Sequence, residues 1–161
     1  MKKLLLTAQF IICILLITNA QIVLEKTYSA QNFSDVFSTN LGSLGYKYWR
    51  SVMDSNQLIL YNIDHSIYKI ISVPPQPVSY GIAYVSDSLF DLDPDIDYML
   101  FLWNTPFSFF IYNENGTSLL SVKSAQPKNF NNGVYSFKPI LYTDNGFKLN
   151  LKTASGADSN F

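Results

Sequence analysis

Five aspartates stand close together in the middle of the chain, four of them at every second position. They are Asp87, Asp91, Asp93, Asp95 and Asp97. Alternating carboxylates can supply the oxygen ligands that Ca²⁺ prefers, and Asp91, Asp93 and Asp95 are the candidate ligands. The stretch is not an EF-hand loop, because Ile96 stands where that loop needs glycine and Leu102 where it needs glutamate. The sequence therefore favours a solvated turn begun by the Asp-Pro dipeptide, with a calcium-stabilised module as the alternative.

Two carboxylates at a set separation are also the catalytic device of glycosidases, and Asp97 with Glu114 is the candidate pair. Other catalytic signatures are missing: His65 is the one histidine, Cys13 is the one cysteine, and the sequence has no G-x-S-x-G elbow or Walker loop. His65 stands at a polar hairpin tip, where its tolerance of unusual backbone angles explains it. The sequence predicts no enzyme, and a secreted carbohydrate-active enzyme with paired carboxylates is the alternative.

Aromatic side chains offer a third kind of chemistry, because exposed rings stack on the apolar faces of sugars. Tyr46, Tyr48 and Trp49 stand together in a segment that is not fully apolar. In an extended chain Tyr48 and Trp49 point to opposite faces, so one of them faces away from a single core. These three are the candidate ligand-binding residues, against the alternative that their rings fill the core. Trp103, in a segment that is apolar throughout, is expected in the core.

The first twenty residues have the charged, apolar and small-residue regions of a secretory signal peptide. Lys2 and Lys3 precede the apolar run, and Thr18-Asn19-Ala20 supplies the small residues, so we expect cleavage between Ala20 and Gln21. The apolar run is too short, and its flank too uncharged, to favour a permanent membrane span. The sequence predicts a secreted or cell-surface protein with no transmembrane span after cleavage.

Removing residues 1–20 changes the composition that matters for folding. The remaining 141 residues contain no cysteine, nine Lys/Arg and twelve Asp/Glu, for a formal charge of −3. A chain of this length can bury a core within one domain, and that core must stabilise it without disulfides. The weak negative charge and the lack of a Lys/Arg cluster argue against a nucleic-acid partner. Of the 141 residues, 24 are aromatic, which favours strands.

Short runs of apolar residues, separated by turn-forming residues, predict antiparallel strands along the whole chain, and no run has a helical period. The expected strands are Ile22–Tyr28, Tyr46–Val52, Leu58–Ile63, Ile67–Val73, Gly81–Val85, Ile96–Trp103, Phe107–Tyr112, Thr117–Val122, Val134–Tyr142 and Phe147–Leu151. Asn115-Gly116 and Asn145-Gly146 tolerate the positive φ of tight hairpin turns. Leu58–Tyr61 and Tyr98–Trp103 are apolar on both faces, so they are expected to be central strands.

A faint repeat divides the predicted domain. Leu58–Asn62 and Phe109–Asn113 both read as three apolar residues followed by Tyr-Asn, at an offset of 51 residues. We expect one all-β domain over residues 21–152, followed by a polar tail at 153–161, with truncation of the chain as the alternative to a different export route. The repeat-like units are 46–73, 78–122 and 134–152. Antiparallel meander or hairpin repeats packed as a β-sandwich are the predicted fold, with an incomplete propeller-like or prism-like arrangement as the alternative.

The chain contains the segment Tyr84–Asp93 followed by Ile96–Leu100, the hairpin Ile111–Gly116 and the junction Ala20-Gln21. These segments resemble secreted β-repeat proteins of the Bacteroidota, which usually carry a type IX secretion sorting domain. The resemblance covers Tyr46 to Lys152 and implies an exported, surface-associated β protein. It implies no particular activity or catalytic residue. No sorting domain follows in this sequence, which ends at Phe161.

These observations together predict an exported, surface-associated and non-enzymatic binding or interaction module. Polysaccharide, bound through exposed aromatic rings, and cell-surface proteins are the expected classes of partner. No cofactor is expected apart from the calcium ion considered above.

Overall fold

The computed structural model describes residues 26–28, 35–90, 93–103, 107–127, 140–144, 146–153 and 158–160. Within these ranges the chain is almost entirely β-strand, with two three-residue 3₁₀ helices, η1 (Gly42–Leu44) and η2 (Met53–Ser55). The predicted leader with its Ala20-Gln21 junction lies outside the described residues, as does Asp91. In the described part of the chain, no helix is long and apolar enough to cross a membrane.

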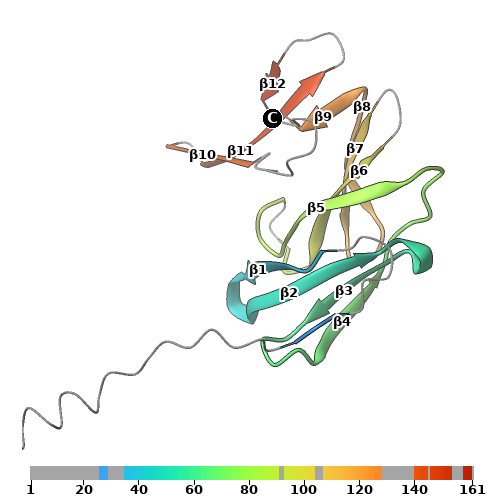
Figure 1. The fold of residues 1–161 in the computed structure, drawn as a ribbon. Coiled ribbons are helices and arrows are strands. Elements are labelled where there is room, and N and C mark those ends of the chain that lie inside the picture. The colour runs from blue at the N-terminus through green and yellow to red at the C-terminus, as the bar shows by residue number, and fades with distance from the viewer. Residues whose placement is uncertain are drawn as a thin grey trace, which may run out of the picture.

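The first sheet is an antiparallel meander in which each strand pairs with its neighbour in sequence (Figure 1). Its strands, in spatial order, are β1 (Phe37–Leu41), β2 (Gly45–Val52), β3 (Gln57–Tyr61) and β4 (Ile67–Ser72). Lys26–Tyr28 is expected to belong to a strand, but these residues form no strand. Strand β1 was not predicted, because Phe-Ser-Thr-Asn-Leu has too few apolar residues to reveal it.

The second sheet repeats this arrangement, again in sequence order. Its strands are β5 (Tyr80–Ser86), β6 (Asp97–Leu102), β7 (Ser108–Asn113) and β8 (Ser118–Lys123). Every residue of β6 is buried, which confirms the expectation for Tyr98–Leu102. The expectation for Trp103 is wrong: β6 ends one residue earlier, and Trp103 is 37% exposed with its ring edge-on to Phe101.

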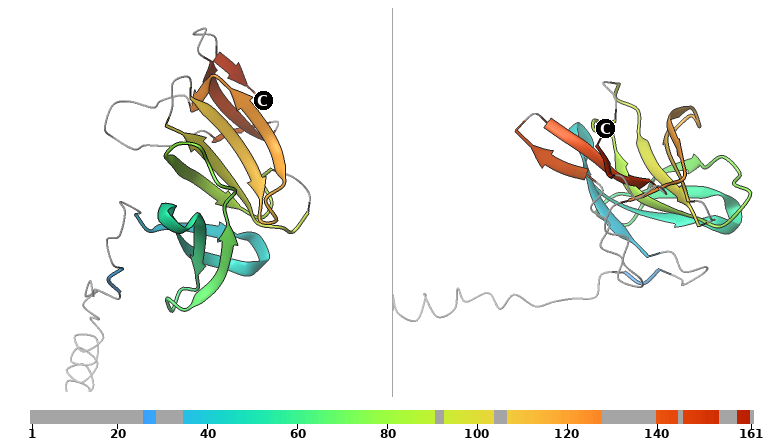
Figure 2. Two further views of the ribbon diagram at one scale, coloured as in Figure 1. Left: turned by 90° about the vertical axis from the view of Figure 1, so that its right-hand side faces the viewer. Right: turned by 90° about the horizontal axis from the view of Figure 1, so that it is seen from above.

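The C-terminal strands form a third, smaller antiparallel sheet. They are β9 (Ala125–Pro127), β10 (Ile140–Thr143), β11 (Gly146–Thr153) and β12 (Asp158–Asn160). In Figures 1 and 2 (left) the second sheet lies between the first sheet, below it, and the C-terminal strands, above it. Residues 153–161, expected as a polar tail, contribute the end of β11 and the whole of β12.

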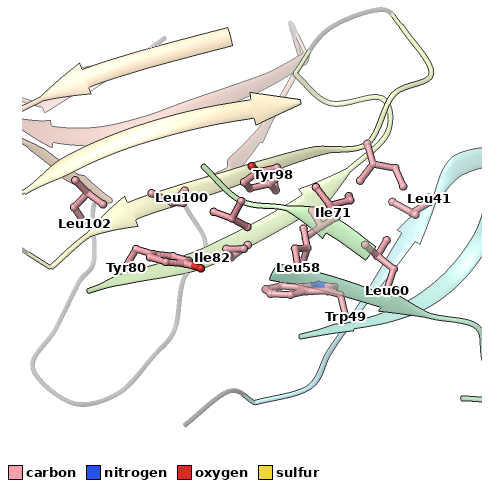
Figure 3. Close-up of a cluster of buried hydrophobic side chains, with 13 residues drawn as sticks. Leu41, Trp49, Leu58, Leu60, Ile71, Tyr80, Ile82, Tyr98, Leu100 and Leu102 are labelled. Carbon is pink, nitrogen blue, oxygen red and sulfur yellow. The ribbon is translucent and has the colours of Figure 1, made fainter. Parts of the chain in front are cut away.

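Two cores hold these layers together. The first lies between the first and second sheets, where Trp49 and Leu58 face Tyr98 and Leu100 (Figure 3). The second lies on the other face of the second sheet, where Phe109 and its neighbours meet Leu149 and Leu151 of β11. The all-β sandwich is thereby confirmed. Because apolar surface on both faces of the second sheet leaves water, this sheet is the centre of the hydrophobic stabilisation.

The hairpins β3–β4 and β7–β8 have the same geometry. Leu58 pairs with Ile71 as Phe109 pairs with Val122, and each hairpin has a register shift at the position before its tyrosine. Corresponding backbone hydrogen bonds close the two turns. The fourth turn residue has a positive φ in both, 65° at His65 and 82° at Gly116, as a type I turn with a bulge requires.

Candidate functional site

A cleft of about 500 Å³ lies where β1 and β2 of the first sheet meet β5 of the second. Phe147, at the start of β11, reaches it from the C-terminal sheet. Its lining combines aromatic rings with hydroxyl and amide groups. The described lining residues are Phe37, Ser38, Thr39, Asn40, Tyr46, Trp49, Ala83, Tyr84, Val85, Ser86, Ser88, Leu89 and Phe147. A cavity of this volume, with polar groups set among apolar ones, is typical of a small-ligand site.

The pairing of β1 with β2 creates the aromatic wall of the cleft. Phe37 is the register partner of Trp49, and their rings stack with centroids 4.7 Å apart and planes 26° apart. Trp49 is only 4% exposed and belongs to the first core, whereas Phe37 is 46% exposed. Of the pair Tyr48 and Trp49, Trp49 is therefore the ring that faces the core. Both residues line the cleft, so they form one stacked pair in which Phe37 is the exposed ring.

Tyr46 is the predicted binding residue that the structure places most openly on the cleft. It is 64% exposed and begins the regular part of β2. The turn before it needs two glycines, because Gly42 and Gly45 have φ values of 38° and 71°. This turn ends β1 and returns the chain as β2, which brings Tyr46 to the same cleft as Phe37.

Hydrogen bonds hold the polar wall of the cleft in place. The Thr39 hydroxyl donates to the carbonyl oxygen of Val85 over 2.7 Å, which ties β1 to β5. The backbone N–H of Ser88 donates to the Ser86 hydroxyl oxygen over 3.3 Å. Ser38 and Asn40, which alternate with Thr39 along β1, are also among the lining residues. The cleft thus offers donors and acceptors beside its exposed rings.

Tyr48 lies outside this cleft and takes part in a separate aromatic cluster. Its ring stacks on His65 with centroids 5.3 Å apart and planes 6° apart. Tyr28 forms a 2.7 Å hydrogen bond with Nδ1 of His65 and packs edge-on against Tyr61. Burial, together with the nearby Tyr61 and Tyr48, raises the pKa of Tyr28. The structure therefore separates Tyr48 from Tyr46, and Tyr48 helps to hold Lys26–Tyr28.

The aspartate series contains a turn with its own hydrogen bonds. Oδ1 of Asp93 accepts from the backbone N–H of Asp95 over 2.9 Å, as expected of an Asx turn. Oδ2 of Asp95 accepts from the Asn115 side chain over 3.0 Å. Among the described residues no three acidic, histidine or cysteine side chains group into a metal site. Because Asp91 is not among them, the calcium hypothesis stays a prediction.

The candidate catalytic carboxylates do not line the cleft. Glu114 forms a 2.6 Å ion pair with Lys69 of β4 and accepts a 3.1 Å hydrogen bond from the backbone N–H of Ile96. Glu114 therefore connects the first and second sheets. Asp97 is fully buried at the start of β6. Glu114 is thus engaged in an ion pair, and Asp97 is buried. The paired-carboxylate mechanism stays a prediction.

Sequence reasoning missed Phe37, Tyr84 and Phe147 as cleft residues. They come from three different sheets, so no local spacing relates them. The available signal was residue type alone, since each is a large aromatic residue. A scan against protein-family models, a search of curated proteins and a search of solved structures each found no match for this chain.

Proposed function

We propose that this protein is an exported, surface-associated binding module without enzymatic activity, and that it holds a glycan in the cleft. The observation that carries the proposal is the exposure of Phe37 and Tyr46 beside the hydroxyl and amide groups of β1. The C–H faces of a sugar ring are apolar and stack on such rings, while its hydroxyl groups need donors and acceptors at the rim. The cleft supplies both kinds of group.

Export and surface association rest on the predicted signal peptide and on the resemblance to secreted Bacteroidota proteins. Expression with the leader in a secreting bacterial host, followed by N-terminal sequencing of the product, tests export. The expected first residue is Gln21. An extracellular product that retains residues 1–20 contradicts the predicted cleavage.

Glycan binding is tested by applying the purified protein to a polysaccharide array. Phe37→Ala and Tyr46→Ala should each weaken binding by about tenfold, the loss expected when an aromatic anchor worth about 1.4 kcal/mol is truncated. Tyr68→Ala, at a partly exposed tyrosine of β4 outside the cleft, is the matched control and should bind as the parent does. Thermal melts of all three variants show whether each remains folded.

Three results would contradict parts of this proposal. If the folded protein binds no polysaccharide, the glycan ligand is wrong, and a protein partner at the cell surface becomes the alternative. If binding depends on Tyr48 and not on Phe37 or Tyr46, the site is the cluster around His65. Steady hydrolysis of a glycoside, abolished by Asp97→Asn or Glu114→Gln, would show that the protein is an enzyme.

A further inference from the structure

A buried carboxylate stands between two residues of the polar wall of the cleft in the sequence. Asp87 stands between Ser86 and Ser88, both of which line the cleft, and is itself only 9% exposed. Its Oδ1 is buried and has no hydrogen-bond partner among the described residues. A Cβ atom added to Gly42 would come within 3.1 Å of Oδ2, so the carboxylate packs closely against the bare backbone of that turn.

An ionised carboxylate in this position would contribute a negative potential to the adjacent cleft. A charge that is removed from water is weakly screened, so it acts more strongly on a neighbouring charge than a surface carboxylate does. The described lining residues add rings, hydroxyls and an amide, and none of them carries a basic group. A carboxylate or sulfate on a ligand would therefore lose hydration next to Asp87 without gaining a cationic partner there.

We infer that the cleft selects uncharged glycans and discriminates against uronates and sulfate esters. This inference rests on the proposed glycan-binding function and names its substrate class. The hydroxyl groups of a neutral sugar can exchange hydrogen bonds with Ser38, Asn40 and Ser88, whereas an anionic substituent meets the field of Asp87.

Matched oligosaccharides that differ only at C6 test the discrimination. β-1,4-Mannohexaose is compared with β-1,4-hexamannuronate, and cellohexaose with β-1,4-hexaglucuronate, by calorimetry at low salt beside a full array of neutral and anionic polysaccharides. The neutral member of a pair should bind at least about tenfold more tightly, which corresponds to 1.4 kcal/mol. Equal or tighter binding of anionic glycans, lost in Tyr46→Ala, overturns the inference and leaves the proposed function intact. No binding to either class overturns both.

Three variants, one of them a control, test whether the discrimination comes from Asp87 and the cleft residues beside it. Ser88→Arg places a cation at the cleft and should raise affinity for the anionic oligosaccharide about tenfold, with a gain that disappears in salt. Ser118→Arg adds the same charge on β8, outside the cleft, and should leave both affinities unchanged. Asp87→Asn, checked for folding by thermal melting, should raise anionic binding without adding a cation. If Ser88→Arg and Ser118→Arg behave alike, the inference is wrong.

Discussion

The β3–β4 and β7–β8 hairpins have the same register, bulge and turn, yet they bury corresponding side chains in different cores. Leu58 of β3 faces the first core, between the first and second sheets. Phe109, at the corresponding place in β7, faces the second core, where it meets β11. The side of β7 that faces the first core instead carries Phe110 and Tyr112.

The difference shows how the layers are stacked. We call the side with Leu58 or Phe109 the front of its sheet. The front of the first sheet packs on the back of the second, and the front of the second packs on β11. The β3–β4 hairpin, at the edge of the stack, therefore has one face covered by another sheet. The β7–β8 hairpin, in the middle, has both faces covered. This explains why β6 must be apolar on both faces.

The largest expected effect comes from placing a charge in the doubly covered sheet. Leu100→Asp should cost more than about 4 kcal/mol, because a carboxylate enters a fully buried strand without a partner. Ile70→Asp, at an exposed position on β4, is the contrasting variant and should cost little. Thermal melting followed by far-ultraviolet circular dichroism measures both. An unchanged melting temperature for Leu100→Asp would mean that β6 is not buried in solution.

The next effect distinguishes the two turns. Gly116→Ala should destabilise the protein by about 1–2 kcal/mol, because its φ of 82° is unfavourable for a residue with Cβ. The added Cβ would meet Pro74 at 3.6 Å, an ordinary contact, so the cost is in the backbone.

His65→Gly relieves the same kind of strain but removes the contacts with Tyr28 and Tyr48. Urea unfolding should show that this replacement also destabilises the protein. A gain in stability would show that the aromatic cluster contributes less than the strain costs. Gly116→Asn, which better tolerates positive φ, is the control and should cost less than Gly116→Ala.

A smaller effect tests whether the two cores are separate. Ile71→Val in the first core and Ile111→Val in the second should each cost about 0.5–1.5 kcal/mol. Because the two residues belong to different clusters, the double variant should equal the sum within about 0.5 kcal/mol. A coupling of 1 kcal/mol or more, measured by urea unfolding, would show that the cores act as one.

The smallest expected effect is a pH dependence in one turn. The hydroxyl and backbone N–H of Ser66 both donate to Oδ1 of Asp64, and these bonds lower the pKa of that carboxyl below its ordinary 3.8. Because the pKa of Asp64 is lower in the folded state than in the unfolded state, its ionised carboxylate stabilises the folded protein at pH values above the unfolded-state pKa. This stabilisation is lost as the pH falls through the folded-state pKa.

Nuclear magnetic resonance between pH 6 and pH 2 should detect this titration at the Ser66 amide. The amide of Thr117 is the internal control, since it donates to the neutral side chain of Asn113 and should not follow the same titration. A Ser66 midpoint at or above the ordinary aspartate value would contradict the hydrogen-bonded turn.

Strands β2 to β8 could be predicted from the sequence because apolar runs and turn residues are local signals. The αL position of Gly116 follows from Asn-Gly in the same way. The cleft could be predicted only through Tyr46, since Phe37 and Phe147 approach it through pairing and packing between distant segments. The sequence left open which of Tyr48 and Trp49 faces the core, because both rings suit a core and a binding surface; packing between distant segments buries Trp49.

The sequential pairing of the strands also bears on the order in which the molecule folds. In the first and second sheets each strand pairs with its neighbours in sequence. Each meander can therefore form by closing short loops, without pairing to a distant segment. The cores differ, because among the described residues the front of each sheet is covered by residues that come later in the chain. During synthesis a completed first meander therefore exposes Leu58 and Trp49 until the second meander arrives, and a completed second one exposes Phe109 until β11 follows.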